Sequence, residues 1–237
     1  MLRKAAAAFA QWIFGGTCLL CRGAAEQGLL CAACDADLPR LGQALCPRCA
    51  IPATAGAICG RCLAHPPRYD ATVAALEYRF PADVLVHALK FRGELALAGL
   101  LGRLLAERIA PDPPVHLILP VPLAARRLRE RGYNQALEIA RYVARATGGR
   151  LAPEACERSR DTPAQIGLPW AERATNVRGA FRAPRPLDGA TIAVLDDVMT
   201  TGATLDELAR VLKAAGAVSV ACWVVCRTAA GTTASHV

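Results

Sequence analysis

Four C-x-x-C pairs fall within the first 62 residues, and they constrain the fold of this chain more than any other feature. They hold eight of the 11 cysteines, and nine residues separate the two pairs of each half. A C-x-x-C turn aims two thiolates at one point, and two such turns complete the tetrahedral sulfur shell that zinc prefers. The predicted metal ligands are Cys18, Cys21, Cys31, Cys34, Cys46, Cys49, Cys59 and Cys62.

Other uses of paired cysteines compete with zinc. A redox pair accounts for one C-x-x-C but not for four, an iron–sulfur cluster also takes four thiolates, and disulfides need an oxidising compartment. We favour zinc, as one ion or two, with the pairs closed in sequence or cross-braced. Because the module has few large apolar side chains, metal should supply most of its folding energy, on the order of 10–16 kcal/mol per site. The other cysteines, Cys156, Cys222 and Cys226, are expected to pack in a core.

The first 17 residues combine two basic residues with a short apolar stretch, which resembles a secretory signal. Gln11 interrupts that stretch, and the residues before Cys18 form an unconvincing cleavage or lipid-attachment site. We therefore expect an N-terminal helix over residues 1–17 and a cytoplasmic protein, in which thiols stay reduced. No apolar run reaches the roughly 18 residues that a membrane span needs, so we expect no membrane span.

The rest of the chain is expected to form two units. Two prolines between residues 64 and 70 break the cysteine pattern, which predicts a cysteine-rich module over 18–66 and a second domain over 67–237. Apolar residues make up 54% of the chain, enough for a buried core, and this excludes general disorder. The net charge of +8 comes mostly from arginine and suits phosphate or polyanion partners, although a GC-rich genome explains the same surplus.

Segments of strand length alternate with helical periodicity throughout the second domain. The predicted strands cover 71–78, 115–121, 191–195 and 218–226, and the predicted helices cover 95–109, 134–147 and 204–215. Units of this kind predict an α/β fold with a mainly parallel sheet, right-handed crossovers and flanking helices. Ligands bind such sheets at the carboxyl ends of the strands, so a site is expected after Val121 and Leu195.

The segment after Leu195 combines two acids with a threonine-rich turn. Asp196 and Asp197 end the predicted strand, and Thr200–Thr204 lead into the next helix. A helix start offers unpaired N–H groups and the positive end of its dipole to an anion, and hydroxyls add donors. Carboxylates repel phosphate but accept hydrogen bonds from sugar hydroxyls. The pattern therefore indicates a phosphosugar site, against the simpler interpretation of a strand-to-helix turn with Asp197 and Thr201 as caps.

This segment, VLDDVMTTGAT, resembles the phosphoribosyl-pyrophosphate (PRPP) signature of type I phosphoribosyltransferases. The resemblance extends over nearly the whole chain, to the ComF/GntX family of bacteria. It is carried by the four C-x-x-C pairs and by three further stretches: His87–Gly93, Val121–Gln135 and Thr162–Phe181. The resemblance implies a type I phosphoribosyltransferase-like domain, preceded by a small zinc-ribbon or knuckle module.

The resemblance also implies roles for individual residues. Asp196 and Asp197 are the catalytic candidates, and PRPP carrying Mg²⁺ is the expected ligand. The candidates for its 5-phosphate are Thr200, Thr201, Gly202, Ala203 and Thr204, and those for its pyrophosphate are Arg126, Arg127, Arg131 and Lys90. The four basic residues of the pyrophosphate group have simpler interpretations as well. The arginines would also suit a solvated basic helix or a nucleic-acid contact, and the lysine would also suit a merely exposed side chain. Arg173 and Asn176 are candidates within an expected flap over 158–182.

Two classes of function stay open. The first is an enzyme that transfers phosphoribosyl from PRPP to a nitrogen acceptor. The second is a non-enzymatic adaptor that binds single-stranded DNA or competence proteins and whose phosphoribosyl site senses a nucleotide or PRPP. The resemblance implies a role in DNA uptake and natural transformation, which is compatible with both. Aromatic residues make up only 5% of the chain, so there is little support for a surface on which the bases of single-stranded DNA would stack.

Overall fold

The computed structural model describes residues 16–26, 28–54, 56–109, 115–160 and 177–229. Its strands are β1 (Gly16–Thr17), β2 (Ala24–Ala25), β3 (Ala71–Glu77), β4 (Leu117–Pro120), β5 (Arg150–Leu151), β6 (Glu157–Arg158), β7 (Phe181–Arg182), β8 (Thr191–Met199) and β9 (Ser219–Arg227). Its helices are α2 (Ala32–Ala36), α3 (Gly60–Ala64), α4 (Ala82–Phe91), α5 (Ala96–Ala106), α6 (Ala125–Arg131), α7 (Gln135–Thr147) and α9 (Ala203–Ala214), with a 3₁₀ turn at Pro153–Ala155.

The main sheet is parallel, as predicted, with the order β3-β9-β8-β4-β5. The chain runs outward from β4 to β5 and then returns to the other side of β4 to form β8. The order of the strands therefore reverses between β4 and β8. Ligands of open α/β sheets bind at such a reversal, beyond the carboxyl ends of the strands. This places the expected site between the loop that follows β4 and the loop that follows β8.

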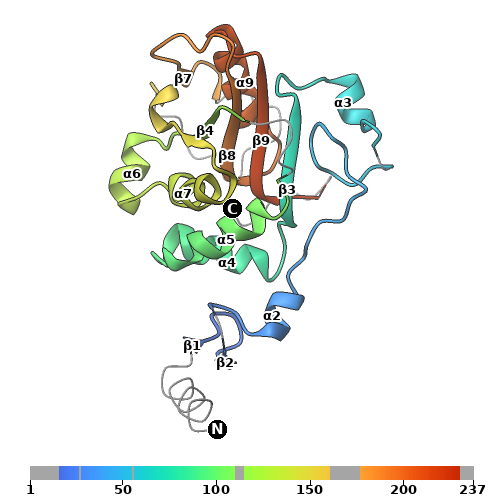
Figure 1. The fold of residues 1–237 in the computed structure, drawn as a ribbon, viewed down its shortest axis with the longest axis vertical. Coiled ribbons are helices and arrows are strands. Elements are labelled where there is room, and N and C mark those ends of the chain that lie inside the picture. Colours follow the sequence, from blue (N-terminus) through green and yellow to red (C-terminus); the bar gives the residue numbers. More distant parts are fainter. Residues whose placement is uncertain (1–15, 27, 55, 110–114, 161–176, 230–237) are drawn as a thin grey trace.

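Helices cover both faces of this sheet (Figure 1). On one face α4, α5 and α7 pack in a core with Ala193 and Leu195 of β8. On the other face α9 packs with Ile192 and Val194 of the same strand. This alternation follows from the period of two along a strand, and it explains why β8 is apolar at consecutive positions: both of its faces are buried. The predicted α/β fold class is confirmed.

Local signals set the limits of α7. The Asn134 side chain accepts a hydrogen bond from Ala136 N (3.0 Å) at the start of the helix, and Gly148 takes a left-handed conformation at its end (φ 72°). Both residues are favoured in these places, because the amide caps an unpaired N–H and glycine carries no Cβ. Asn134 also donates to the carbonyl of Val121 (3.0 Å), which anchors the loop after β4 to this helix.

The link between the two cysteine-rich halves covers the free edge of the main sheet. Leu41 N donates to Ala75 O (3.0 Å) and Glu77 N donates to Pro39 O (2.8 Å), so this link pairs antiparallel with β3. An uncovered edge strand offers unpaired backbone groups to other chains. The link therefore protects the sheet as well as connecting the cysteine clusters.

Two of the C-x-x-C turns lead directly into short helices, the second pair into α2 and the fourth pair into α3. Two local expectations need correction or stay open. Of the helix expected over 1–17, residues 1–15 lie outside the described residues, and Gly16–Thr17 form β1. The domain boundary near residue 66 stays a prediction. Within the described part of the chain, no helix has the length and apolar character required to cross a membrane.

Candidate functional site

The two acids lie inside a strand rather than after one. β8 was expected to end at Leu195, but it continues to Met199, with Asp196 opposite Val224 of β9. On its other side β8 pairs with β4 only as far as Leu195. Asp196 and Asp197 therefore line the stretch of β8 that extends beyond β4, beside the point where the strand order reverses. Because side chains alternate along a strand, the two carboxylates leave opposite faces of the sheet.

Asp197 forms a buried ion pair with Lys90. The ammonium nitrogen of Lys90, at the C-terminal end of α4, lies 3.3 Å from Asp197 Oδ1, and the two side chains are 11% and 4% exposed. The other carboxylate oxygen, Asp197 Oδ2, is buried and has no hydrogen-bond partner among the described residues. Such an atom is costly unless something donates to it. Lys90, predicted to bind pyrophosphate, thus lies next to the acid pair.

Asp196 is half-buried, and its Oδ1 accepts a hydrogen bond from Asp197 N (2.9 Å). Desolvation first, and then the negative charge of Asp197, raise the pKa of Asp196, and Lys90 only partly offsets this. Two adjacent acids with one lysine paired to Asp197 therefore carry an electrostatic cost in the ligand-free protein. A ligand that donates hydrogen bonds to these carboxylates relieves that cost.

The raised pKa of Asp196 predicts how Asp196→Asn changes stability with pH. An acid whose folded pKa is raised contributes stability below its unfolded pKa, and that contribution is lost as pH rises through the folded pKa. Asparagine does not ionise, so the variant should gain stability relative to the parent as pH rises from 5 to 9. Water screens a partly exposed carboxyl, so we expect a gain on the order of 1 kcal/mol. Urea unfolding at pH 5, 7 and 9 measures it, and a gain that shrinks with rising pH contradicts the assignment.

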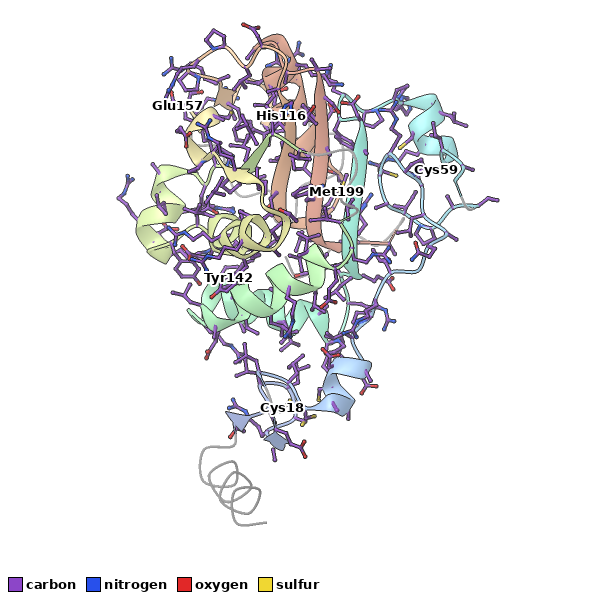
Figure 2. All side chains as sticks on the ribbon, in the orientation of Figure 1. Cys18, Cys59, His116, Tyr142, Glu157 and Met199 are labelled. Atoms are coloured by element: carbon purple, nitrogen blue, oxygen red, sulfur yellow. The ribbon has the colours of Figure 1, made fainter. Side chains whose placement is uncertain are left out.

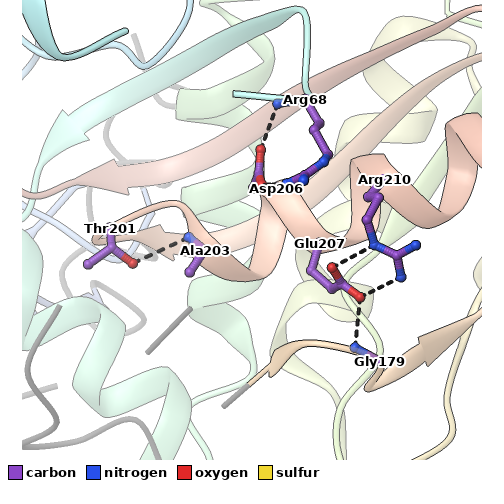
Figure 3. Close-up of polar contacts among 7 residues, drawn as sticks. All are labelled: Arg68, Gly179, Thr201, Ala203, Asp206, Glu207 and Arg210. Atoms are coloured by element: carbon purple, nitrogen blue, oxygen red, sulfur yellow. Dashed lines mark hydrogen bonds and ion pairs between the residues drawn. The ribbon is translucent and has the colours of Figure 1, made fainter. Parts of the chain in front are cut away.

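The turn between β8 and α9 has the shape expected of an anion-binding loop. Gly202 is left-handed (φ 84°) and precedes α9, which begins at Ala203. Thr201 Oγ1 accepts from Ala203 N (3.3 Å), as Figure 3 shows, so this hydroxyl lies at the helix start. Thr204 lies in the first turn of α9. Residues 200–204 thus combine a short loop with a helix N-terminus, where N–H groups favour negative charge.

Asp206, in the first turn of α9, would oppose an anion there if its charge were free. Arg68 neutralises it: its backbone N–H and its guanidinium each donate to the Asp206 carboxylate at 2.6 Å (Figure 3). A cavity of about 550 Å³ lies beside this pair, next to the loop but away from Asp196 and Asp197. It is lined by Arg68, Arg178, Gly179, Ala203, Asp206, Glu207 and Arg210.

The predicted arginines lie on α6, which follows β4 at the other side of the strand reversal. Arg131 lies 5.2 Å from the ring centre of Phe91. Burial lowers the pKa of Arg131, and the negative charge of Asp197 opposes that shift, so this guanidinium lies within electrostatic range of Asp197. Arg127 is partly buried, whereas Arg126 is exposed and pairs with Glu130 on its own helix (2.7 Å). Arg173 and Asn176 lie outside the described residues.

The eight paired cysteines form two clusters that close in sequence, the first with the second pair and the third with the fourth. Within each cluster the four sulfur atoms all lie within 4.8 Å of one another. The distances Cys21–Cys31 and Cys49–Cys59 are 3.7 and 3.6 Å, close to the roughly 3.8 Å edge of a tetrahedron with Zn–S bonds of about 2.3 Å. Both donor sets fit Zn²⁺. In Figure 2 Cys59 lies beside the β3 edge of the sheet, and Cys18 lies below α4.

Two arginines near the site were not predicted. Arg61 of α3 donates to the carbonyl of Thr201 (2.6 Å), and Arg227, at the end of β9, donates to the carbonyl of Met199 (2.9 Å). Both contacts join segments far apart in the sequence. No local pattern distinguishes these residues from the other arginines of the chain.

Comparisons with known proteins agree with this architecture. The family model of the double zinc ribbon domain matches residues 9–63, and that of the phosphoribosyl transferase domain matches residues 114–236. DNA utilization protein YhgH of Escherichia coli (strain K12) is 36% identical over 222 residues, which cover 90% of this chain and 97% of that protein. Competence protein F of Haemophilus influenzae is 29% identical over 223 residues, 89% and 96% of the two chains. The chain belongs to the ComF family.

The family extends to more distant relatives. Competence protein ComFC of Bacillus subtilis is 26% identical over 196 residues, which cover 77% of each chain. This ComF-family chain therefore combines a double zinc ribbon with a phosphoribosyltransferase-type domain, as the motifs indicated. The roles of individual residues around Asp196 and Asp197 stay predictions.

Proposed function

We propose that this protein binds PRPP at the strand reversal between β4 and β8. The observation that carries this proposal is the buried Asp197 Oδ2, which lacks a donor among the described residues, a few positions before an anion-binding loop. A ribose 5-phosphate satisfies both features, because its hydroxyls donate to the acids and its phosphate accepts hydrogen bonds from the N–H groups of residues 200–202. Neither a simple anion nor a neutral sugar satisfies both.

The second half of PRPP is matched by positive charge. Arg131 of α6 lies within electrostatic range of Asp197, and Arg127 lies on the same helix. Their guanidinium groups suit a pyrophosphate, whose oxygens accept paired hydrogen bonds. In transfer chemistry such groups stabilise charge that develops on the departing pyrophosphate. We infer that these two arginines hold the pyrophosphate and that the positive charge of Lys90 stabilises the ionised carboxylates of the acid pair.

Mg²⁺ fits this arrangement as a companion of the ligand. Magnesium prefers oxygen donors and is usually held by substrate phosphates, water and one or two carboxylates rather than by a full protein cage. The carboxylates of Asp196 and Asp197 are the protein oxygens that suit it here. When bound, the ion would neutralise charge on the pyrophosphate. The protein's own residues would position the ribose between the acids and the loop.

The names of the relatives suggest where such a protein acts. They are called DNA utilization and competence proteins, and we propose that this chain serves DNA uptake or the use of DNA taken up. A second candidate follows from the same names and from the net charge of +8: a single-stranded DNA adaptor whose PRPP site senses the nucleotide supply. Both candidates keep the ligand site and differ in whether phosphoribosyl is transferred.

A panel of ligands tests the proposal. Calorimetric titrations measure the affinity for four ligands: PRPP with Mg²⁺, ribose 5-phosphate, inorganic pyrophosphate and a single-stranded oligonucleotide. The second and third ligands each fill one half of the proposed site, and the fourth tests DNA binding. We expect PRPP to bind at least tenfold more tightly than either fragment, because only PRPP engages both halves. Equal binding of PRPP and pyrophosphate would refute the phosphosugar site. Pyrophosphate release with candidate amines then separates transferase from sensor, and salt-dependent oligonucleotide binding identifies the adaptor.

The loop itself can be tested at Gly202. A Cβ there would lie 2.8 Å from Met199 Cε and 3.1 Å from Tyr69 Oη, and the left-handed φ adds strain. Gly202→Ala should therefore displace the loop and weaken PRPP binding at least tenfold. Gly189 is also left-handed (φ 72°), but a Cβ there has no neighbour within 4 Å. Gly189→Ala, with a similar backbone cost of about 1–2 kcal/mol, should keep the affinity of the parent. Equal affinities in the two variants would contradict the role of the loop.

A further inference from the structure

Arg227 joins the second cysteine cluster to the anion-binding loop. The residue is 3% exposed. Its Nε donates to the carbonyl of Cys49 (2.7 Å), and its Nη1 donates to the carbonyls of Met199 (2.9 Å) and Thr200. One buried guanidinium therefore binds the backbone carbonyl of a predicted metal ligand, of the last residue of β8 and of the first residue of the loop.

Within the described part of the chain, no carboxylate is paired with the charge of Arg227. None of the ion pairs among the described residues includes Arg227, and burying an unpaired charge is costly. Four thiolates around one Zn²⁺ carry a net charge of about −2, and the charge of such a centre must be counted with its surroundings. The loaded cluster is the natural counter-charge for Arg227, whereas four neutral thiols are not.

Arg61 adds a second connection from the same cluster. It lies between the ligands Cys59 and Cys62 on α3, and it donates to the carbonyl of Thr201 (2.6 Å). The carbonyls of residues 199, 200 and 201 are thus all held by arginines that lie within this cluster or bind its backbone. In a trans peptide the C=O and the following N–H point in opposite directions. Holding these carbonyls therefore directs the N–H groups of residues 200–202 to the other side, where an anion would bind.

We propose that the cluster Cys46/Cys49/Cys59/Cys62, when loaded with Zn²⁺, positions the phosphate-binding loop through Arg227 and Arg61. The inference rests on the proposed PRPP site. Zinc at the second ribbon is then a determinant of ligand affinity, whereas zinc at the first ribbon is not. Among the described residues, no hydrogen bond connects the cysteines of the first cluster to residues 199–204.

A matched pair of cysteine variants tests this division. Cys59 and Cys31 are both partly exposed, and each immediately precedes the short helix of its cluster. Each variant, Cys59→Ser and Cys31→Ser, should lose one equivalent of zinc by metal analysis. We expect Cys59→Ser to bind PRPP at least tenfold more weakly and to show faster amide exchange over residues 198–206 without ligand. Cys31→Ser should keep both properties within about twofold of the parent.

A second set of variants leaves the zinc ligands intact, in case Cys59→Ser fails to fold. Arg61 is exposed, so Arg61→Ala should fold and keep both zinc equivalents. It should bind PRPP three- to tenfold more weakly and exchange faster over residues 198–206. Arg61→Lys keeps a donor for the Thr201 carbonyl and should restore most of the affinity, which a general loss of packing would not allow.

The outcomes separate this inference from the proposed function. If the parent binds PRPP and both cysteine variants bind it equally well, the coupling is wrong and the PRPP site stands. If the parent does not bind PRPP, the proposed function fails. The exchange data then decide the structural half of the inference: faster exchange in Cys59→Ser alone supports it, and equal exchange in the two variants overturns it.

Discussion

Replacing Lys90 with methionine is expected to lower the free energy of unfolding by about 3–5 kcal/mol at neutral pH. The ammonium group forms the ion pair with Asp197 Oδ1 (3.3 Å), and Oδ2 already lacks a donor among the described residues. Removing one partner of a buried pair leaves the other charge uncompensated, which costs more than the pair itself contributes. Chemical unfolding of the zinc-loaded protein measures the loss.

Two controls make this prediction specific. Lys213 pairs with Asp70 at 2.7 Å, but the side chains are 33% and 37% exposed, so Lys213→Met should cost about 1 kcal/mol or less. The double variant Lys90→Met/Asp197→Asn removes both charges and should recover much of the stability lost in Lys90→Met. Equal losses in the two lysine variants, or no recovery in the double variant, would contradict a buried pair between Lys90 and Asp197.

Much of the fold follows from local signals. Asn134 and Gly148 delimit α7 because a cap and a left-handed glycine act within a few residues. The C-x-x-C spacing likewise predicts metal clusters, because two cysteines in one turn already converge. The parallel sheet follows from the alternation of strand and helix patterns, since parallel strands need long crossovers.

The rest depends on contacts between distant segments. The extension of β8 through Asp196 and Asp197 requires β9 beside it, and no local pattern shows where that pairing stops. Lys90 meets Asp197 only because α4 packs over the carboxyl end of the sheet. Arg227 meets the Cys49 carbonyl across 178 positions of the sequence. The sequential closure of the cysteine pairs also follows from the folded chain and not from the spacing, which allowed a cross-braced arrangement.

We expect the carboxylates of Asp196 and Asp197 to be essential for ligand binding, although they lower the stability of the ligand-free protein. Asp196→Asn should stabilise the ligand-free protein at high pH. It removes a carboxyl group whose pKa is raised by burial and by the charge of Asp197. The same change removes an acceptor for a ribose hydroxyl. Stability and affinity should therefore move in opposite directions, as they do where a site is built for its ligand and not for stability.

The most direct measurement is a calorimetric titration with PRPP and Mg²⁺ at pH 8.5 on three proteins: the parent, Asp196→Asn and Asp196→Asn/Asp197→Asn. We predict a loss of affinity of at least tenfold in the single variant and at least a hundredfold in the double variant, with thermal unfolding and zinc content confirming that each is folded. Folded, zinc-loaded variants that bind PRPP as tightly as the parent would contradict the account, because the two carboxylates would then have no part in holding the ribose.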